Sequence, residues 1–359
     1  MTAVHQFVPY LAARDAVGEH TLRVQETLRG VGIESEIYAG EAQPDLRSRA
    51  EPFRAFRGDA GAWLLYQSSV GSPVAGFVLA RPERKLLHYH NITPPGYFEA
   101  WEPHVAWVLA EGRVELAEFA ERAVLGLADS GFNEGELRAV GFTRTAVVPV
   151  LVDVSVGEVD EVALGRLEEG RGRGAVWLFV GRVAPNKMQH EVVEAFALYR
   201  RVFDPGARLR LVGGVSSPVY EVALRALVDR LGLGGVVELA GSVSSGELVA
   251  HYRSADVFVC LSEHEGFCVP VLEAMAYGVP VVALAAAAVP GTVGEAGVLL
   301  ERSSRALVAE AVARVVSDAG LRAGLLAAGR RRVEAFSLER GRRLLLDALL
   351  PLLDERVPA

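Results

Sequence analysis

Short runs of β-branched and aromatic residues alternate with longer amphipathic runs along almost the whole chain. In the first half the short runs occupy residues 3–11, 34–40, 61–69, 84–92, 121–130 and 144–152. The second half repeats the rhythm at residues 175–183, 207–214, 235–241, 255–262, 279–284 and 296–300. Helical patterns separate several of them, at residues 19–32, 104–123, 190–203, 218–233, 244–255 and 269–278. This alternation predicts an α/β fold with two parallel sheets in tandem, each covered by helices on both faces.

A stretch of low periodicity divides the two halves. Residues 148–175, VPVLVDVSVGEVDEVALGRLEEGRGRGA, are rich in glycine and acids and end just before a strong new strand at Val176. A chain of 359 residues also exceeds what one hydrophobic core usually supports. We therefore predict two domains that meet near residues 155 and 156.

Composition and charge exclude several classes of protein. A net charge of −8 speaks against a nucleic-acid partner held by phosphate contacts. The two cysteines, Cys260 and Cys268, are too few for a disulfide framework and lack a metal-motif spacing, so we predict reduced, buried packing residues. The N-terminus shows no signal-peptide pattern, and no apolar run is long enough to cross a bilayer. A cytoplasmic protein is expected.

Ligands of open α/β sheets bind at the carboxyl ends of strands, so the strand exits are the places to look for a site. Neither the dinucleotide fingerprint G-x-G-x-x-G nor a P-loop follows any predicted strand. The exit after residues 175–180 instead reads GRVAPNK, with Arg182 and Lys187 in one turn. Two cations directed at one point suit a diphosphate. The alternative is a pair of solvated surface charges.

The exit after residues 255–261 reads SEHEGFCVPVLEAMAYG. Pro270 suits the first position of a helix, which makes the preceding backbone amides a site for an anion. Glu265 is predicted in the loop and Glu273 in the first helical turn. Carboxylates accept hydrogen bonds from hydroxyls, so two of them beside an anion site indicate a sugar nucleotide. The alternatives are an exposed loop acid for Glu265 and helix-dipole complementarity for Glu273.

These motifs, GRVAPNK and then GSVSSGELVAHYRSADVFVCLSEHEGFCVPVLEAMAYGVPVVA, closely resemble the retaining glycosyltransferases of family 4 over residues 175–300. The resemblance implies the GT-B architecture, two Rossmann-like domains facing across a cleft. It implies an acceptor-binding domain at 1–155, a donor-binding domain at 156–337, and a C-terminal helix, about 338–359, that packs back on the first. It assigns Arg182 and Lys187 to the diphosphate. It assigns Glu265 to the donor sugar, beside the backbone amides of Gly266, Phe267, Cys268 and Val269. It assigns Glu273 to the ribose and Val243 to the nucleobase edge.

In the N-terminal half the motif HYHN, at a strand exit, resembles the histidine loop of the family. The resemblance places His90 at the donor sugar near the reaction centre, with Asn91 and Thr93 along the cleft. The alternative for a histidine in this position is a satisfied core residue.

Two further strand exits carry weaker assignments. RDAVGEH resembles the first loop of the family, with Asp15 and Gly18 near the phosphates or the acceptor, although it is poorer in glycine than many relatives. LYQSSVGS, at the third strand exit, places Tyr66 and Ser68 at the acceptor by topology alone. Gly291 stands where many relatives have an acid, so it receives no role.

The resemblance implies transfer of a hexosyl group from a UDP- or GDP-sugar to a hydroxyl of a carbohydrate or small-molecule acceptor, on the face that the nucleotide leaves. The catalytic residues expected are Glu265, His90, Arg182 and Lys187. The chain contains no Asp-x-Asp pair, so no metal and no other cofactor is expected. The two cations then stabilise the departing diphosphate.

Other functions of the same architecture stay open: an epimerase, a hydrolase, or a non-catalytic subunit that binds a sugar nucleotide. A pyridoxal-dependent phosphorylase is excluded, because it would need a cofactor-binding lysine late in the chain and no lysine follows Lys187. Residues 45–58, DLRSRAEPFRAFRG, carry four arginines and two phenylalanines. They form either a solvated surface or a weak contact with anionic lipid at the inner face of the membrane. The sequence does not name the sugar, the base or the acceptor.

Overall fold

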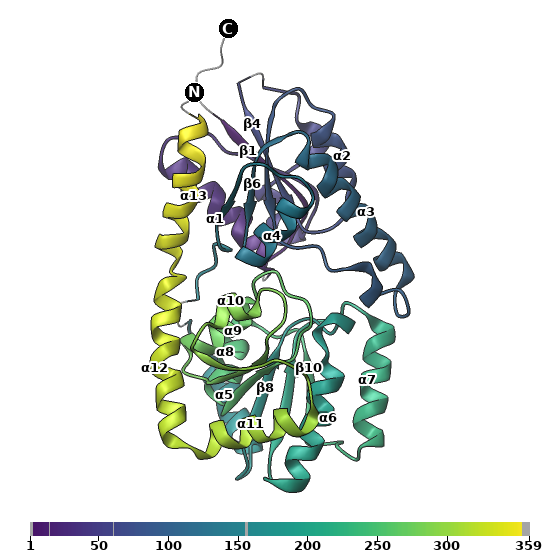
Figure 1. Cartoon of the computed structure of the whole chain (residues 1–359), viewed down its shortest axis with the longest axis vertical. Coiled ribbons are helices and arrows are strands. Elements are labelled where there is room, and N and C mark those ends of the chain that lie inside the picture. The colour runs from purple at the N-terminus through teal and green to yellow at the C-terminus, as the bar shows by residue number, and fades with distance from the viewer. Residues whose placement is uncertain (1–2, 14, 60, 155–156, 354–359) are drawn as a thin grey trace. The chain divides into compact units, whose positions relative to one another are not determined.

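A computed structural model describes residues 3–13, 15–59, 61–154 and 157–353, which fall into two compact units (Figure 1). Unit 1 takes in the described residues up to Gly96, Pro103–Asp153 and those from Phe336 onward. Unit 2 takes in Tyr97–Glu102 and the described residues of Val154–Ala335. The predicted boundary at residues 155 and 156 lies outside the described residues, and the division falls just before it. No local pattern predicted that a six-residue segment from the first half would join unit 2.

Unit 1 contains a seven-stranded parallel sheet in the order β3-β2-β1-β4-β5-β6-β7. Its strands are β1 Val4–Leu11, β2 Ile37–Ala42, β3 Glu51–Pro52, β4 Trp63–Ser68, β5 Arg84–Tyr89, β6 Ala123–Ala128 and β7 Thr145–Val147. Five of the six predicted ranges contain one of these strands, and the range 34–40 overlaps the first part of β2. The short edge strand β3 was not predicted. The central strands are buried on both faces, which explains why they read as apolar runs.

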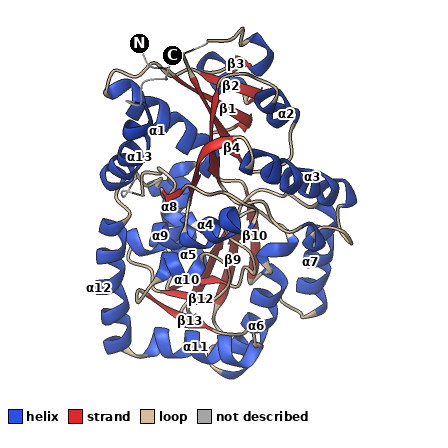
Figure 2. Cartoon of the chain, turned by 45° about the horizontal axis from the view of Figure 1, so that its top comes forward, coloured by secondary structure: helices blue, strands red, loops and turns tan. Residues whose placement is uncertain are grey.

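Helices cover both faces of this sheet (Figure 2). Val24 and Leu28 of α1 (Ala16–Gly30) share one core with Leu65 of β4 and with Leu345 and Leu349 of α13 (Leu338–Leu353). Because successive residues of a strand point to opposite faces, the residues next to Leu65 in β4 face α2 (Pro73–Leu79) and α3 (Pro103–Ala120). α4 (Gly131–Ala139) follows β6. The last described helix, α13, therefore contributes to the core of unit 1, although it lies far along the chain from the strands of that unit.

Unit 2 contains a six-stranded parallel sheet in the order β10-β9-β8-β11-β12-β13. Its strands are β8 Val176–Val180, β9 Arg208–Val212, β10 Val237–Gly241, β11 Val257–Cys260, β12 Val281–Leu284 and β13 Gly297–Leu300. Its helices are α5 Glu161–Gly170, α6 Gln189–Val202, α7 Pro218–Arg230, α8 Ser245–Arg253, α9 Val269–Ala276, α10 Val289–Val293, α11 Arg305–Ser317 and α12 Ala319–Ala335. All six strands of this sheet lie inside predicted ranges. β8, β11 and β12 are buried apolar runs, whereas β10 and β13 are partly exposed.

The stretch predicted to lack periodicity contains a helix, α5, which corrects the expectation for residues 148–175. Asp160 caps it, accepting a hydrogen bond from the amide of Ala163 at 2.9 Å. Ala163, Leu164 and Leu167 are buried and pack with Ala250 of α8. This apolar face is short and is surrounded by acids and glycines, so the composition of the stretch concealed it.

The segment Tyr97–Glu102 packs on unit 2 by aromatic and polar contacts. The ring of Trp101 meets Tyr220 edge to face at 5.2 Å, and Ser217 Oγ donates to the carboxylate of Glu102 at 2.9 Å. Tyr97 lies with its ring 6.3 Å from that of His264. The segment thereby brings Tyr97 to the loop that follows β11.

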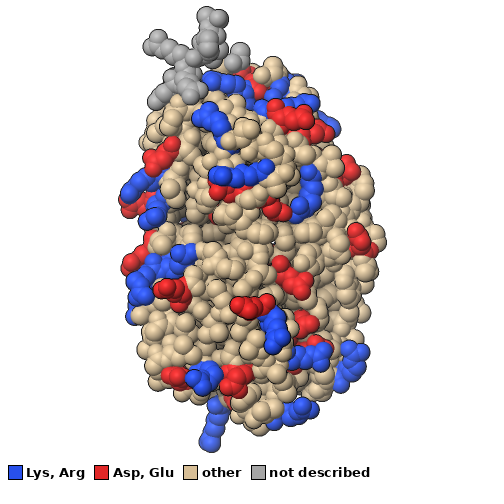
Figure 3. Space-filling view, in the orientation of Figure 1, with Lys and Arg blue, Asp and Glu red and all other residues tan. Residues whose placement is uncertain are grey.

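On the face drawn in Figure 3, Lys and Arg are interspersed with Asp and Glu. The four arginines of residues 45–58 are exposed, but Phe56 is buried against Phe7 and Tyr38, and Phe53 is half-buried against Phe77. The aromatic half of this candidate lipid contact therefore faces the interior of unit 1. Among the described residues, no helix has both the length and the apolar character needed to cross a membrane.

Candidate active site

Two strand exits of unit 2 are tied together by three contacts. β8 and β11 are neighbours in the sheet, so the loops that follow them leave the same edge side by side. The amide of Glu263 donates to the carbonyl oxygen of Asn186 at 3.0 Å, and the side chain of Asn186 donates to the carbonyl oxygen of His264 at 3.2 Å. Lys187 Nζ donates to Oε1 of Glu265 at 2.7 Å. The structure thus brings together a predicted diphosphate ligand and a predicted sugar ligand.

The ion pair of Lys187 and Glu265 is sheltered from water. The two side chains are 17% and 11% exposed, so neither is the solvated surface charge that the sequence left as an alternative. Shelter from water strengthens a charge pair relative to pairs on the open surface. A ligand that enters here meets a cation and a carboxylate whose positions are already fixed.

Arg182 leaves the same strand exit but remains exposed, and it makes no ion pair with a carboxylate among the described residues. Its main chain is held in place, because its carbonyl oxygen accepts from Gln189 Nε2 at 2.8 Å. The preceding Gly181 has a φ of 156°, and a Cβ on the neighbouring Gly213 would lie 2.2 Å from the Gly181 oxygen. The backbone is therefore fixed while the guanidinium group is available to a ligand.

Helix α9 begins at Val269, preceded by Cys268 in the left-handed conformation with a φ of 72°. Pro270 is its second residue, one position later than predicted, and Glu273 is its fifth, in the second turn instead of the first. Helix-dipole complementarity acts within the first turn, so it does not account for Glu273. Among the described residues, the amides of Gly266, Cys268 and Val269 donate to no acceptor, as an anion site at a helix start requires.

The remaining predicted donor contacts lie on the same edge of the sheet. Phe267 is buried, and its carbonyl oxygen accepts from Thr292 Oγ1 of α10 at 2.5 Å, which fixes the loop before α9. Val243 is half-buried between β10 and Ser244, the residue that caps α8. The donor contacts that the resemblance assigns to these two residues stay predictions.

Glu273 has a specific partner that the sequence did not reveal. The phenol of Tyr252, on α8, donates to Oε2 of Glu273 at 2.7 Å. Tyr252 is buried and stacks on Tyr277, with ring centroids 5.3 Å apart. Burial, with the charge of Glu273, raises the pKa of Tyr252 well above its usual value. The phenol therefore stays protonated and holds the carboxylate as a neutral donor.

The two cysteines are free and buried, as predicted. Their sulfur atoms lie 3.8 Å apart, and Cys260 also contacts Ser262 Oγ at 3.4 Å. The hydrogen bond between the two thiols lowers the pKa of Cys260 and raises that of Cys268. A carboxylate oxygen of Glu265 lies within 4.8 Å of both sulfur atoms, a proximity that the eight-residue spacing did not suggest.

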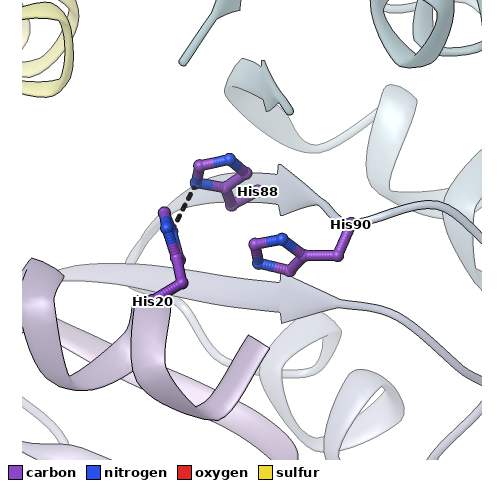
Figure 4. Close-up of side chains that lie close together, drawn as sticks. All are labelled: His20, His88 and His90. Carbon is purple, nitrogen blue, oxygen red and sulfur yellow. Dashed lines mark hydrogen bonds between the residues drawn. The ribbon is translucent and has the colours of Figure 1, made fainter. Parts of the chain in front are cut away.

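In unit 1, His90 belongs to a buried cluster of three histidines, with His20 from α1 and His88 from β5 (Figure 4). The His90 side chain is 1% exposed. Its Nδ1 lies 2.9 Å from Oδ2 of Asp129, and its Nε2 lies 2.7 Å from Oε1 of Gln67. Both ring nitrogens are thus occupied within unit 1, so the ring is not free to meet a sugar in this arrangement.

A main-chain group fixes the direction of the hydrogen bonds that run from Gln6 through Gln67 to His90. Gln6 Nε2 donates to the carbonyl oxygen of Thr21, which leaves its Oε1 to accept from Gln67 Nε2. Gln67 Oε1 therefore faces His90 and requires an N–H there. Oδ2 of Asp129 lies 2.9 Å from the other ring nitrogen, so the ring of His90 is held at both nitrogens inside unit 1.

At the other end, the amide of Leu151 donates to His20 Nδ1 at 2.9 Å, so the proton of His20 is on Nε2. That nitrogen donates to His88 Nδ1 at 3.0 Å, and His88 Nε2 lies 3.0 Å from Oδ1 of Asp129. Burial lowers the pKa of His20 well below its usual value and also lowers that of His88. These two rings are therefore neutral donors that help to hold Asp129.

Asp15 and Gly18 have structural roles at the start of α1. Asp15 is the N-cap and accepts from the amide of Gly18 at 3.3 Å. A Cβ on Gly18 would lie 2.0 Å from the carbonyl oxygen of Ala12, so only glycine fits. Their predicted contact with phosphates or acceptor stays a prediction.

Of the predicted acceptor residues, Tyr66 does not fit its role. Its side chain is 1% exposed and stacks on Phe119 of α3 at 4.9 Å, in the core of unit 1. Ser68 is also buried, at the end of β4, where its carbonyl oxygen accepts from the amide of His90. Strand alternation places Tyr66 on the face beneath α3, a choice that the sequence pattern did not specify.

Asn91 and Thr93 follow β5 and are half-buried. Asn91 has a φ of 76°, and its Nδ2 donates to Asn133 Oδ1 at 2.9 Å and to Glu136 Oε2 at 3.0 Å. These contacts tie the loop to α4. Thr93 lies two residues further along the same loop.

Residues 168–332 match the family model described as "Glycosyl transferases group 1". We refer to this matched segment as the group 1 domain. It contains all the predicted donor contacts of unit 2, from Arg182 to Glu273.

The chain is also similar to curated proteins. Over 239 residues the chain is 35% identical to D-inositol 3-phosphate glycosyltransferase of Geodermatophilus obscurus, a match that covers 64% of this chain and 52% of that protein. The chain spans about half the length of the curated relatives it matches.

Two solved structures show the fold of the whole chain. Sucrose-phosphate synthase of Thermosynechococcus elongatus has a TM-score of 0.80 at 20% identity, covering 99% of this chain and 100% of that one. HepE of Anabaena, in complex with UDP-glucose, has a TM-score of 0.74 at 17% identity, covering 97% and 99%. The chain has the GT-B fold with two Rossmann-like domains, as predicted.

Sequence reasoning missed the residues that hold the predicted ones in place. In the group 1 domain these are Asn186 and Tyr252, and in unit 1 they are Gln67 and Asp129. A signal existed for the second pair, because Gln67 interrupts an apolar strand and Asp129 stands at a strand exit. A polar side chain inside a buried strand needs a partner, which makes it a marker for a network.

Proposed function

We propose that the protein is a retaining glycosyltransferase that moves a hexosyl group from a UDP- or GDP-sugar to a hydroxyl acceptor. The observation that carries the proposal is the sheltered pair of Lys187 and Glu265 at adjacent strand exits of the group 1 domain. Arg182, exposed on the same loop, adds a second cation. A sugar nucleotide supplies the two chemical groups that this site can bind, a diphosphate for the cations and hydroxyls for the carboxylates.

In the proposed step, the acceptor oxygen forms a bond to the anomeric carbon while the bond from that carbon to the diphosphate breaks on the same face. The proton of the acceptor passes to the departing phosphate oxygen. Arg182, Lys187 and the amides before α9 stabilise the negative charge that develops there. Glu265, held by Lys187, orients the sugar hydroxyls and offsets positive charge at the anomeric carbon. No divalent metal takes part in this scheme.

In the proposal, unit 1 supplies the acceptor contacts and His90. Because Gln67 and Asp129 take both ring nitrogens, His90 would meet the sugar through its main chain, or after its bond to Gln67 exchanges. Ser68, Asn91 and Thr93 keep their predicted places at the acceptor. Tyr66 is left out, because its side chain lies in the core.

The test begins with a panel of UDP- and GDP-hexoses in thermal unfolding of the full chain, since a ligand of the folded state raises the unfolding temperature by mass action. The donor that stabilises most is then supplied with acceptors, and the anomeric configuration of the product is read by NMR. Arg182→Ala should lower turnover by about 10²–10³, the effect of removing one preorganised charge-stabilising group. Arg230→Ala, an exposed arginine at the end of α7, is the matched control and should leave turnover unchanged.

Each part of the proposal can fail separately in this test. No stabilisation by any sugar nucleotide would contradict the binding site. Release of sugar at a rate independent of acceptor would indicate a hydrolase. A product of inverted configuration would exclude the same-face step.

A further inference from the structure

Cys260, Cys268 and Glu265 place three potential metal ligands around one point in unit 2. Cys260 ends β11, Cys268 precedes α9, and Glu265 lies in the loop between them. One ligand atom from each lies within 4.8 Å of the others. Both cysteines are buried, while the Glu265 side chain is 11% exposed and gives the group access to solvent.

The spacing of the two sulfur atoms matches that of a tetrahedral thiolate site. With Zn–S bonds of about 2.3 Å, two sulfur ligands of a tetrahedral ion lie about 3.8 Å apart. The sulfur atoms of Cys260 and Cys268 are 3.8 Å apart without an ion. A carboxylate ligand should lie about 3.5 Å from each sulfur, and an oxygen of Glu265 already lies within 4.8 Å of both sulfur atoms.

The chemistry of the three ligands selects the class of cation. Thiolates prefer soft and borderline ions such as Zn²⁺ and Cd²⁺, whereas Mg²⁺ and Ca²⁺ take oxygen ligands. Two thiolates and one carboxylate also leave the fourth position of a tetrahedral ion open to water, as in sites with three protein ligands.

We propose that Cys260, Cys268 and Glu265 form a binding site for Zn²⁺ or a cation of its class, and that occupation of this site inhibits the enzyme. The inhibition rests on the proposed function, because Glu265 is the predicted sugar ligand and now accepts from Lys187 at 2.7 Å. A cation bound to Glu265 competes with Lys187 for the carboxylate and repels the ammonium group. The predicted sugar ligand, Glu265, and the predicted diphosphate ligand, Lys187, are then both displaced from their positions.

The composition of the chain makes this site simple to observe, because Cys260 and Cys268 are its only cysteines. Cd²⁺ bound to thiolate gives an ultraviolet charge-transfer band, and histidine or carboxylate ligands give none. Titration of the reduced full chain with Cd²⁺ should produce this band with an end point of one ion per chain. Competition with a chromophoric chelator then measures the affinity for Zn²⁺.

Cys260→Ser removes one ligand and should weaken Zn²⁺ binding by at least about 100-fold, since loss of a mere supporting group around a metal weakens it 10–100-fold. Ser262→Ala is the matched control, because it removes a neighbour of Cys260 that is not a ligand. Unfolding temperatures of both variants establish that they are folded. Absence of the Cd²⁺ band in the reduced wild-type chain, or its persistence in Cys260→Ser, would overturn the site.

A transfer assay tests the inhibition separately. Zn²⁺ should inhibit the wild-type chain and EDTA should restore it, while Cys260→Ser should keep its activity in Zn²⁺ at the same concentration. Zn²⁺ that binds at the cysteines without slowing transfer would overturn the inhibition. If no donor supports transfer at all, the proposed function fails, and the Cd²⁺ and Zn²⁺ titrations still decide the site.

Discussion

At the scale of single residues, the group 1 domain holds its two candidate donor carboxylates by different means. Lys187, a cation, holds Glu265, and Tyr252, a neutral phenol, holds Glu273. A carboxylate beside a cation is partly neutralised, whereas one beside a neutral donor keeps its full charge for ligand hydroxyls. The assignments of Glu265 to the reacting sugar and of Glu273 to the ribose stay predictions.

Glu273→Ala should weaken binding of the donor nucleotide, because the ribose hydroxyls lose a charge-assisted partner worth about 1.5–3 kcal/mol. Tyr252→Phe keeps the carboxylate but removes the group that orients it, so its loss should be smaller. Isothermal calorimetry with the nucleoside diphosphate measures both, with Glu301→Ala, an exposed acid, as the control. An unchanged affinity in Glu273→Ala would refute the ribose role.

The buried pair of His90 and Asp129 predicts a large effect on stability. Although burial opposes it, contact with His90 and His88 lowers the pKa of Asp129, so the carboxylate is charged in the folded state. Asp129→Asn removes the buried carboxylate that both His90 and His88 contact and should cost about 3–5 kcal/mol of unfolding free energy. Urea unfolding measures this, with the exposed Asp45→Asn for comparison. A loss below about 1 kcal/mol would contradict a stabilising role for the Asp129 carboxylate.

At the scale of elements, α3 presses an acidic side chain against the start of α2. Glu115 is half-buried, and both of its carboxylate oxygens accept from the amide of Ser72, the residue that caps α2. Burial, with the nearby Glu111 and Glu118, raises the pKa of Glu115 to about 7. The packing of these two helices is thus more favourable when Glu115 carries its proton.

The direction in which stability changes with pH follows from the raised pKa of Glu115. The contribution of Glu115 is fully present below the ordinary pKa of 4.5 and is lost as the pH rises through about 7. Because solvent screens this partly exposed group, its contribution to the free energy of unfolding is about 1 kcal/mol. Glu115→Gln should therefore raise the unfolding temperature at pH 8 more than at pH 5, and the exposed Glu41→Gln should not. An equal gain at both pH values would contradict the raised pKa.

At the scale of the whole molecule, the chain offers no acidic pair of the kind that holds Mg²⁺ or Mn²⁺ on a diphosphate. No Asp-x-Asp occurs in the sequence, and the two groups of potential ligands among the described residues consist of histidines or include two cysteines. We expect EDTA to leave the transfer rate unchanged in metal-free buffer. Loss of transfer on chelation, with recovery on addition of Mg²⁺ or Mn²⁺, would show that the two-cation account of the leaving group is wrong.

The exposed arginines at positions 47, 49, 54 and 57 predict at most a weak, salt-sensitive contact with anionic lipid. Each arginine near such a surface contributes about 1 kcal/mol, which salt screens. The buried Phe56 adds nothing, and the net charge of −8 opposes the contact. Sedimentation with anionic liposomes at low salt, lost at physiological salt, is the expected result. No sedimentation at low salt would rule the contact out.

The sequence by itself determined the class of fold and the donor half of the site. Buried parallel strands are apolar on both faces, so all twelve predicted strands could be found without tertiary information. Arg182, Lys187, Glu265 and Glu273 follow two of these strands, and neighbouring strands of one sheet bring their exits together. This part of the site depends on local order along the chain, which a sequence displays.

Only the tertiary structure decided which side chains meet across long separations. Packing placed Tyr66 beneath α3 instead of at a strand exit, and it joined Tyr97–Glu102 to unit 2. It also paired Tyr252 with Glu273 and His90 with Asp129, and it brought the two thiols to 3.8 Å. Each of these contacts joins separate elements of the fold. Their distances depend on how helices and strands pack, which no local pattern of residues specifies.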